Sequence, residues 1–338
     1  MDSLRIDVSP GRWLGADWLD PRGFCRQSRL VIVAGKGGVG KTTVTATLAR
    51  LASRVGLSVL VVEVEGRSAL SSIFGTEPLD YEEQVLAPAT DTTGEIRART
   101  LTPDVALVEY LEEHSLRRLS RRLLRTGALE VVATAAPGIK DILVLGKVKQ
   151  LERAEVADLI VLDAPAAGHA VRFLMSAQAL MDTVNVGPIR AQAQEVLDLL
   201  VDPTRCQVVL VTLPEETPVN EVVETAYALE DRVGTNLGPV VVNGLYPVLE
   251  GLDADPAAAA AALDIGLRPG EATALRQAAA FRSRRQALQA EQVARMADAL
   301  PLPQLHLPAL FDVAMGPAQV DHLADALAAS IEALEVVG

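Results

Sequence analysis

The chain has 338 residues, of which 49% are hydrophobic and 22% charged, and its formal net charge is −13. This composition predicts a soluble globular protein with ample material for a core. The negative charge disfavours nonspecific attraction to DNA or to an anionic bilayer, so we expect no nucleic-acid partner. No apolar run approaches the roughly 20 residues of a membrane span, so we expect no integral membrane segment. Residues 1–7 mix both charges, which predicts no signal peptide and a cytoplasmic location.

The first part of the chain is rich in proline and glycine. Residues 1–28 contain Trp13 and Trp18 among these turn formers, and they predict an irregular N-terminal arm that docks through its indoles. Residues 29–338 are predicted to form a single domain after this arm. Cys25 and Cys206 are the two cysteines of the sequence, and their separation favours neither a disulfide framework nor a cysteine zinc site.

A glycine-rich stretch joins the first predicted strand, residues 30–34, to a predicted helix that starts near residue 44. Its spacing G-x-x-x-x-G-K-T is that of a phosphate-binding loop, in which glycines allow backbone N–H groups to surround phosphates at a helix N-terminus. Lys41 is expected to reach the β- and γ-phosphates, and the Thr42 hydroxyl to bind Mg²⁺. The predicted nucleotide contacts are Gly35, Lys36, Gly37, Gly38, Val39, Gly40, Lys41, Thr42 and Thr43. A glycine-rich turn without a ligand is the less favoured alternative.

The second lysine of the loop narrows the class of protein. The form K-G-G-V-G-K-T-T, which contains Lys36, resembles the deviant Walker A loop of the ArsA-like ATPases and their relatives. In that class the extra lysine crosses a dimer interface to the partner's nucleotide. The resemblance therefore implies that Lys36 is catalytic and that the chain dimerises. Because the sequence holds a single such loop, the second copy is another chain, either identical or paralogous.

The next predicted strand, residues 58–62, ends in the acidic sequence E-V-E-G-R-S. Acidic groups at the carboxyl end of a strand lie on the ligand edge of an open α/β sheet. The stretch resembles the first switch of the family, and Glu65 falls where an aspartate positions the attacking water and contacts Mg²⁺ through water. The additional methylene of Glu65 predicts altered water geometry and slow turnover. A solvated carboxylate at a loop start is the alternative.

Almost sixty residues separate the predicted strands 96–101 and 159–162, although a crossover needs only about a dozen. The helical periodicity within 103–155 indicates an insertion. In ArsA-like proteins a helical subdomain of this kind handles cargo, which implies a client such as a hydrophobic protein segment, bound by helices built from about 103–155 and 170–205. Ordinary helix packing explains the same apolar residues equally well. A basic stripe at 117–125 is interpreted as a solvated helix face, with partner contact as the alternative.

Asp163 directly follows residues 159–162 at the end of this predicted strand. A carboxylate there is expected to hold Mg²⁺ through water. The sequence D-A-P-A-A-G-H resembles the family's second switch, which implies that the backbone N–H of Gly168 approaches the γ-phosphate and that His169 signals its loss. His169 as an ordinary helix-start residue is an equal alternative.

Later strands are predicted at 206–212, 239–243 and 302–308, and helices within 252–299. The resemblance implies that Asn243 reads the adenine edge and that the loop containing Leu310 lies near the base. An Asn-Gly turn is the competing explanation for Asn243. The apolar residues at 320–334 share one helical face, and acidic residues on the helix predict packing on the sheet and not on a membrane.

Together these features predict that residues 29–338 are a single P-loop ATPase-like domain with an α/β fold, a mostly parallel P-loop sheet covered by helices on both faces and an inserted helical subdomain. The predicted function is an ATP-hydrolysing dimeric switch of the ArsA-like family that uses ATP/ADP and Mg²⁺ to capture or release a client. Glu65 in place of aspartate supports an alternative, a nucleotide-binding regulatory or scaffold subunit with very low ATPase activity, partnered with a paralogue.

Overall fold

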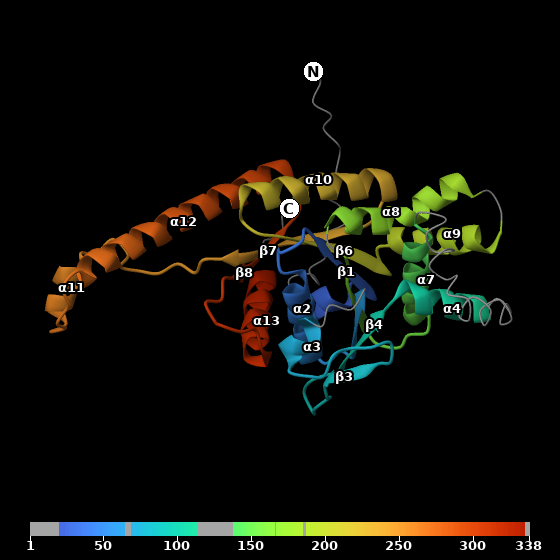
Figure 1. Cartoon of the computed structure of the whole chain (residues 1–338), viewed down its shortest axis with the longest axis horizontal. Helices are drawn as coiled ribbons and strands as arrows, with labels where there is room; N and C mark the ends of the chain where they lie inside the picture. Colours follow the sequence, from blue (N-terminus) through green and yellow to red (C-terminus); the bar gives the residue numbers. More distant parts are fainter. Residues whose placement is uncertain (1–19, 65–68, 114–137, 166, 185–186, 335–338) are drawn as a thin grey trace, which may run out of the picture.

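The computed structural model describes residues 20–64, 69–113, 138–165, 167–184 and 187–334. Its centre is an eight-stranded sheet of order β3-β4-β2-β5-β1-β6-β7-β8, covered by helices on both faces (Figure 1). The strands are β1 (Leu30–Gly35), β2 (Val59–Val64), β3 (Gln84–Ala87), β4 (Ile96–Leu101), β5 (Leu159–Asp163), β6 (Cys206–Thr212), β7 (Leu237–Leu245) and β8 (Gln304–Pro308). The helices are α1 (Pro21–Arg26), α2 (Lys41–Arg54), α3 (Ala69–Phe74), α4 (Pro103–Glu113), α7 (Ile139–Arg153), α8 (Ala167–Thr183), α9 (Pro188–Val201), α10 (Glu216–Val233), α11 (Pro256–Ala262), α12 (Glu271–Ala299) and α13 (Pro317–Glu332).

The described strands pair in parallel, apart from the antiparallel pair of β3 with β4. The six residues of β1 are all buried, because helices cover both faces of a parallel sheet and select continuous apolar runs. The parallel direction brings the carboxyl ends of β1, β2, β5, β6, β7 and β8 to one edge, where α/β proteins bind ligands. The α/β fold predicted from the sequence is confirmed.

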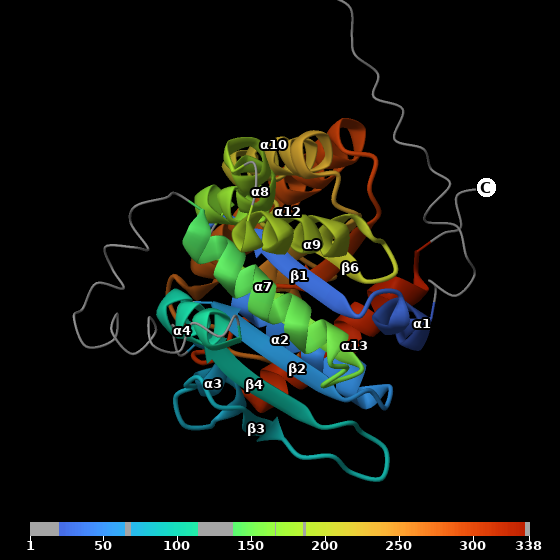
Figure 2. The same ribbon diagram turned by 90° about the vertical axis from the view of Figure 1, so that its right-hand side faces the viewer.

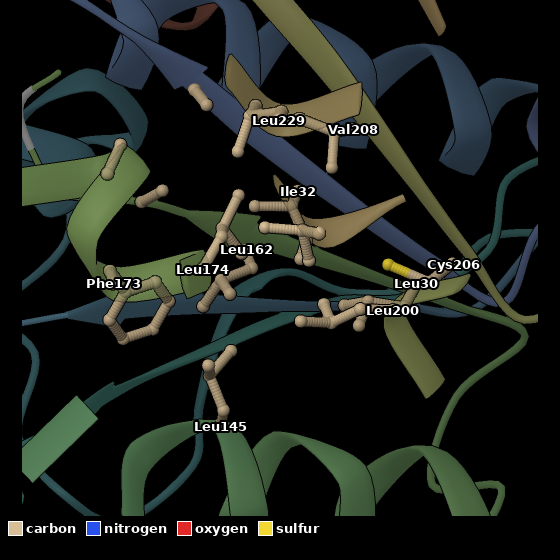
Figure 3. Packing of buried hydrophobic residues seen from close by; sticks show 14 of the residues in the cluster. Leu30, Ile32, Leu145, Leu162, Phe173, Leu174, Leu200, Cys206, Val208 and Leu229 are labelled. Carbon is tan, nitrogen blue, oxygen red and sulfur yellow. The ribbon is translucent and has the colours of Figure 1, made fainter. Parts of the chain in front are cut away.

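One face of the sheet packs against helices α7 to α10. Figure 3 shows Leu145, Phe173, Leu174 and Leu200 from three of these helices meeting the strand residue Leu162, and all of them belong to one buried cluster. Figure 2 shows α7 and α9 in front of the strands, with α7 running roughly along the strand direction. Burial of side chains of this size contributes roughly 1.5–3 kcal/mol each, so this layer is an integral part of the domain core.

The opposite face is covered by α1, α2, α3 and α13. Helix α13 buries Val320, Leu323, Leu327 and Ile331 along one side, at the spacing of an amphipathic helix. Arg50 of α2 donates from Nε to Oδ1 of Asp321 over 2.5 Å, which joins the two helices at their polar margin. The predicted packing of the final helix on the sheet is confirmed.

Three short elements differ from the sequence prediction. Within residues 1–28, the described part is not irregular, because Asp20 caps α1 by accepting from the Gly23 N–H and Phe24 and Cys25 are buried. A helix this short has little periodicity to detect, and its cap and Pro21 are its main sequence signals. Helix α3 and the edge strand β3 were not predicted for the same reason, because they too are short and have little periodicity to detect. Trp13 and Trp18 lie outside the described residues.

The predicted insertion is represented by α4 and α7. Helix α7 contributes to the sheet core, whereas α4 packs on it through a small separate cluster that contains Leu107, Tyr110 and Leu143. The predicted basic stripe at 117–125 lies outside the described residues. The boundaries of a helical subdomain therefore stay a prediction. Among the helices that are described, none has the length and apolar content to cross a membrane.

Candidate nucleotide-binding site

The glycine-rich loop connects the end of β1 to the start of α2 at the ligand edge of the sheet. Gly38 and Gly40 have φ angles of 88° and 90°, a left-handed conformation that residues with a side chain rarely adopt. Gly40 is the N-cap of α2, and a glycine has no side chain that could accept from the first N–H groups of that helix. The loop therefore leaves backbone donors and the positive end of the helix dipole available to an anion.

At two positions of the loop, neighbouring atoms leave no room for the Cβ of a larger residue. A Cβ on Gly40 would lie 2.3 Å from Nδ2 of Asn243, and one on Gly35 would lie 2.4 Å from the carbonyl oxygen of Val211. Asn243 comes so close because its Nδ2 donates to the carbonyl oxygen of Val39 over 2.9 Å. The end of β7 is thus bonded directly to the loop.

The two lysines of the loop have different partners. Lys41 donates from Nζ to the carbonyl oxygen of Lys36 over 3.1 Å, so its ammonium group stays over the loop. Lys36 Nζ pairs with Oε1 of Glu221 on α10 at 2.5 Å, with the side chains 41% and 35% exposed. A half-exposed pair of this kind contributes only about 0–1 kcal/mol, so it leaves Lys36 free to exchange partners. A small hollow beside the pair is lined by Gly35, Lys36, Val211, Pro218, Glu221, Val222 and Thr225.

Asp163, at the end of β5, faces the first turn of α2. Its Oδ2 accepts from the Thr42 hydroxyl over 2.6 Å, while its buried Oδ1 has no hydrogen-bond partner among the described residues. Burial raises the pKa of Asp163 to about 6, and the nearby Glu63 carboxylate adds to that rise. Hydroxyl and carboxylate oxygens are the ligands that Mg²⁺ prefers. The residues present therefore fit a magnesium ion held by Thr42 and Asp163.

Glu63 is a second buried carboxylate, which sequence reasoning missed. It is 4% exposed, it is the register partner of Asp163, and its Oε2 accepts from the Thr100 hydroxyl over 3.3 Å. The predicted strand ended at residue 62, but β2 continues to Val64. The sequence did contain a signal for this residue. Glu63 follows Val59 and Val61 at the two-residue spacing of a strand, so its side chain lies on the same face of the sheet as theirs. Glu65 lies outside the described residues.

The remaining predicted contacts lie around the same edge. Gly168 is in the first turn of α8, directly after β5. Leu310 is half-buried, and the neighbouring Ala309 N–H donates to the carbonyl oxygen of Leu245 over 2.7 Å, which places this loop beside the end of β7. Asn243 and Gly244 both lie inside β7, whose pairing with β8 shifts between Val242 and Leu245, so the Asn-Gly turn considered from the sequence does not form.

The two cysteines lie on opposite faces of the sheet. Cys25 belongs to the buried cluster on the α2 face of the sheet, and Cys206 belongs to the cluster on the opposite face. Burial raises the pKa of Cys25 to about 12 and raises that of Cys206 as well. Both groups are therefore protonated thiols that cannot meet at one metal ion.

Comparison with known proteins places this site in a family. ATPase BagA of Mycobacterium tuberculosis (strain ATCC 25618 / H37Rv) is 35% identical over 303 residues, which cover 84% of this chain and 88% of that protein. The family model described as anion-transporting ATPase, of the ArsA type, matches residues 28–186. The chain belongs to the ArsA-like ATPase family. The match contains the loop, Asp163 and Gly168, so the resemblance inferred from the loop and the second switch is confirmed.

Other relatives of this ArsA-like chain match in part. A putative arsenical pump-driving ATPase of Halobacterium salinarum is 27% identical over 239 residues, or 65% of this chain and 36% of that protein. The ATPase get3 of Schizosaccharomyces japonicus is 31% identical over 144 residues, or 43% of this chain and 42% of that protein. Of these three relatives, the mycobacterial ATPase is the one whose match spans most of both chains.

Proposed function

We propose that this ArsA-like chain hydrolyses MgATP and acts as a dimeric switch. The observation that carries the proposal is the Thr42–Asp163 contact of 2.6 Å in the first turn of α2, directly after a glycine-rich loop whose N-cap residue is Gly40. A hydroxyl and a buried carboxylate at that position are the pair that P-loop NTPases use for the metal of the nucleotide. The ATPase names of the relatives agree with this assignment.

Each residue has a role in the proposed reaction. Backbone N–H groups of the loop bind the phosphates, and the Lys41 ammonium group stabilises charge on the β- and γ-phosphate oxygens. Glu65 is proposed to orient the water whose oxygen attacks the γ-phosphorus in line, with ADP as the leaving group. When bound, Mg²⁺ supplies positive charge that offsets the charge on the phosphate oxygens.

Dimerisation is the second part of the proposal. Lys36 would leave Glu221 and contact the nucleotide of a neighbouring subunit, either a second copy or a paralogue. The weak, half-exposed pair supports this exchange, because breaking it costs at most about 1 kcal/mol. The adenine base would lie near Asn243 and Leu310 at the ends of β7 and β8.

Client binding is the third part. The proposed client-binding region comprises helices within 103–155 and 170–205, and the proposed client is a hydrophobic protein segment. The support comes from the helical periodicity of this region in the sequence and from α4, which packs on α7 through its own small cluster. Movement of Gly168 on loss of the γ-phosphate would connect the nucleotide state to α8, because Gly168 lies in the first turn of that helix.

A direct test is magnesium removal from the purified full-length chain. We expect ATP binding by isothermal titration calorimetry and steady phosphate release with Mg²⁺, and loss of phosphate release when EDTA is in excess over the metal. Restoring Mg²⁺ after EDTA should restore the rate. Absence of ATP binding with Mg²⁺ present would refute the proposal, whatever the hydrolysis rate.

Glu65 supports a second candidate, a nucleotide-binding scaffold that barely hydrolyses ATP. If its longer side chain misplaces the water, Glu65→Asp should raise kcat on the order of 10²-fold, the size expected for correcting a 1 Å misplacement. If the enzyme already works with glutamate, the substitution should leave kcat similar or reduce it. Single-turnover phosphate release at saturating MgATP distinguishes these results, with equal ATP affinity of the two proteins as the control.

A further inference from the structure

Three acidic side chains are buried in the part of the chain that the structure describes. They are Glu63, Glu152 and Asp163, which are 4%, 3% and 7% exposed. Glu152 on α7 is paired with the Arg205 guanidinium, which donates from Nε over 3.1 Å and from Nη2 over 2.5 Å. Within the described ranges, no ion pair reaches Glu63 or Asp163. A buried carboxylate without a counter-charge is unfavourable, so these two acids together point to a bound cation.

Glu63 is the middle residue of a row that crosses three neighbouring strands at the ligand edge of the sheet. The strand register pairs Glu63 of β2 with Thr100 of β4 on one side and with Asp163 of β5 on the other. Val61, two residues earlier on β2, belongs to the buried cluster on the face that α2 covers, so the Glu63 side chain lies on that face as well. Glu63 is therefore on the same side of the sheet as the Thr42–Asp163 contact, one strand further from the glycine-rich loop.

The Glu63 carboxylate is held in place, but most of its acceptor capacity is unused. Its Oε2 accepts from the Thr100 hydroxyl over 3.3 Å, and this is its one hydrogen bond to the described residues. An ionised carboxylate has about four acceptor sites, so several sites stay available to further donors. Asp163 likewise has a buried Oδ1 without a partner in this part of the chain. Mg²⁺ usually keeps several of its water molecules in proteins, and these waters are donors of the kind that both carboxylates lack.

The two carboxylates are close enough to affect each other. Burial is the main cause of the raised pKa of Asp163, and the negative charge of Glu63 raises it further. Two like charges in a buried setting repel each other, and a divalent cation bound beside both would offset that repulsion. Loss of either negative charge should therefore weaken the binding of such a cation.

From this arrangement we infer that Glu63 is a positioning residue for the magnesium ion of the nucleotide. Its carboxylate accepts from water molecules bound to the metal, and the Thr100 hydroxyl fixes the direction of that carboxylate. This role is separate from the one proposed for Glu65, which orients the attacking water. The inference rests on the proposed function, because it requires a magnesium nucleotide at the loop. Residues that contact a metal through its outer shell typically contribute about 10–100-fold to metal affinity.

The first test measures the metal affinity of the full-length chain with ADP bound, so that hydrolysis plays no part. Mn²⁺ binds to the same kind of oxygen site as Mg²⁺, and the electron paramagnetic resonance signal of the free ion reports how much is bound. Glu63→Gln should weaken Mn²⁺ binding by about 10–100-fold. Glu63→Asp restores the charge on a shorter side chain and should recover part of the loss. Thr100→Val removes the donor to Glu63 and should cause a smaller loss in the same direction.

ADP affinity in EDTA, measured by isothermal titration calorimetry, is the control for these variants. It should stay within about twofold of the wild-type value, because Glu63 is proposed to act through the metal and not on the nucleotide.

A second readout separates this role from a structural one. In EDTA and without nucleotide, Glu63→Gln should raise the unfolding temperature, because it removes a buried charge beside Asp163 and keeps an oxygen that accepts from Thr100. Glu152→Gln is the matched control, since Glu152 is buried to nearly the same degree but has a counter-charge. This control should lower the unfolding temperature and leave the Mn²⁺ affinity of the folded protein unchanged.

Three results for Glu63→Gln would overturn the inference. They are Mn²⁺ binding as tight as that of the wild type, an equal loss of ADP affinity with and without metal, and a lowered unfolding temperature in EDTA. A wild type that binds ADP but no Mn²⁺ would also overturn it, while the nucleotide site would stand. Failure of the proposed function is distinguishable, because the wild type itself would then bind neither ADP nor Mn²⁺.

Discussion

Lys41→Ala is expected to lower kcat for ATP hydrolysis by about 10²–10³-fold, the size of effect seen when one preorganised donor to the transition state is removed. The lysine ammonium group is held over the loop by the carbonyl oxygen of Lys36 at 3.1 Å, so it is in place before the nucleotide binds. Alanine would remove that charge and leave the backbone donors of the loop intact. Phosphate release at saturating MgATP measures the loss.

A matched control for Lys41→Ala is Lys140→Ala, a lysine of similar intermediate exposure in the first turn of α7. This control should hydrolyse ATP at the wild-type rate and unfold at the wild-type temperature. Far-ultraviolet circular dichroism checks that both variants are folded. Undiminished turnover by Lys41→Ala would show that the loop does not act on ATP, and the proposed reaction would have to be abandoned.

Asp163→Asn is expected to reduce kcat by a similar factor, about 10²–10³-fold, and to stabilise the protein that lacks metal and nucleotide. Asparagine keeps the size of the side chain and can still accept from the Thr42 hydroxyl. It loses the negative charge that would attract Mg²⁺. Loss of activity together with a gain in stability would distinguish a metal-binding role from a structural one.

The stability gain follows from the pKa of Asp163, which burial raises from 3.8 to about 6. A carboxyl group with a raised pKa binds its proton more tightly in the folded state, so its ionisation opposes folding. Stability should therefore fall as pH rises through the window from about 4 to about 6, by roughly 3 kcal/mol in total. Above that window the penalty is fully present, and bound Mg²⁺ would offset it.

Thermal unfolding in EDTA at pH 4.5 and pH 7.5 measures this effect. The advantage of Asp163→Asn over wild type should be larger at pH 7.5 than at pH 4.5. Asp158→Asn is a control with the opposite expected effect on stability, and Asp158 directly precedes β5. The Ser58 hydroxyl and N–H lower the pKa of Asp158, so its ionisation stabilises the fold above the unfolded pKa and that variant should lose stability at pH 7.5. Equal pH dependence of wild type and Asp163→Asn would contradict the argument.

Sequence reasoning located the features that depend on neighbours along the chain. The loop at 35–43, the buried strands and the carboxylate at the end of β5 all follow from local spacing and periodicity. Local spacing and periodicity predicted a mostly parallel sheet, but they did not predict the order of the strands within it. A continuous apolar run indicates burial on both faces but does not identify the neighbouring strand.

Sequence alone thus determined the fold class, the family and the position of the glycine-rich loop, because a glycine pattern between a strand and a helix is a local feature of the chain. Only the tertiary structure decided that Glu63 lies beside Asp163, that Asn243 bonds to Val39 and that Lys36 pairs with Glu221. Each of these contacts joins residues that are distant in the chain, and strand register and helix packing bring them together.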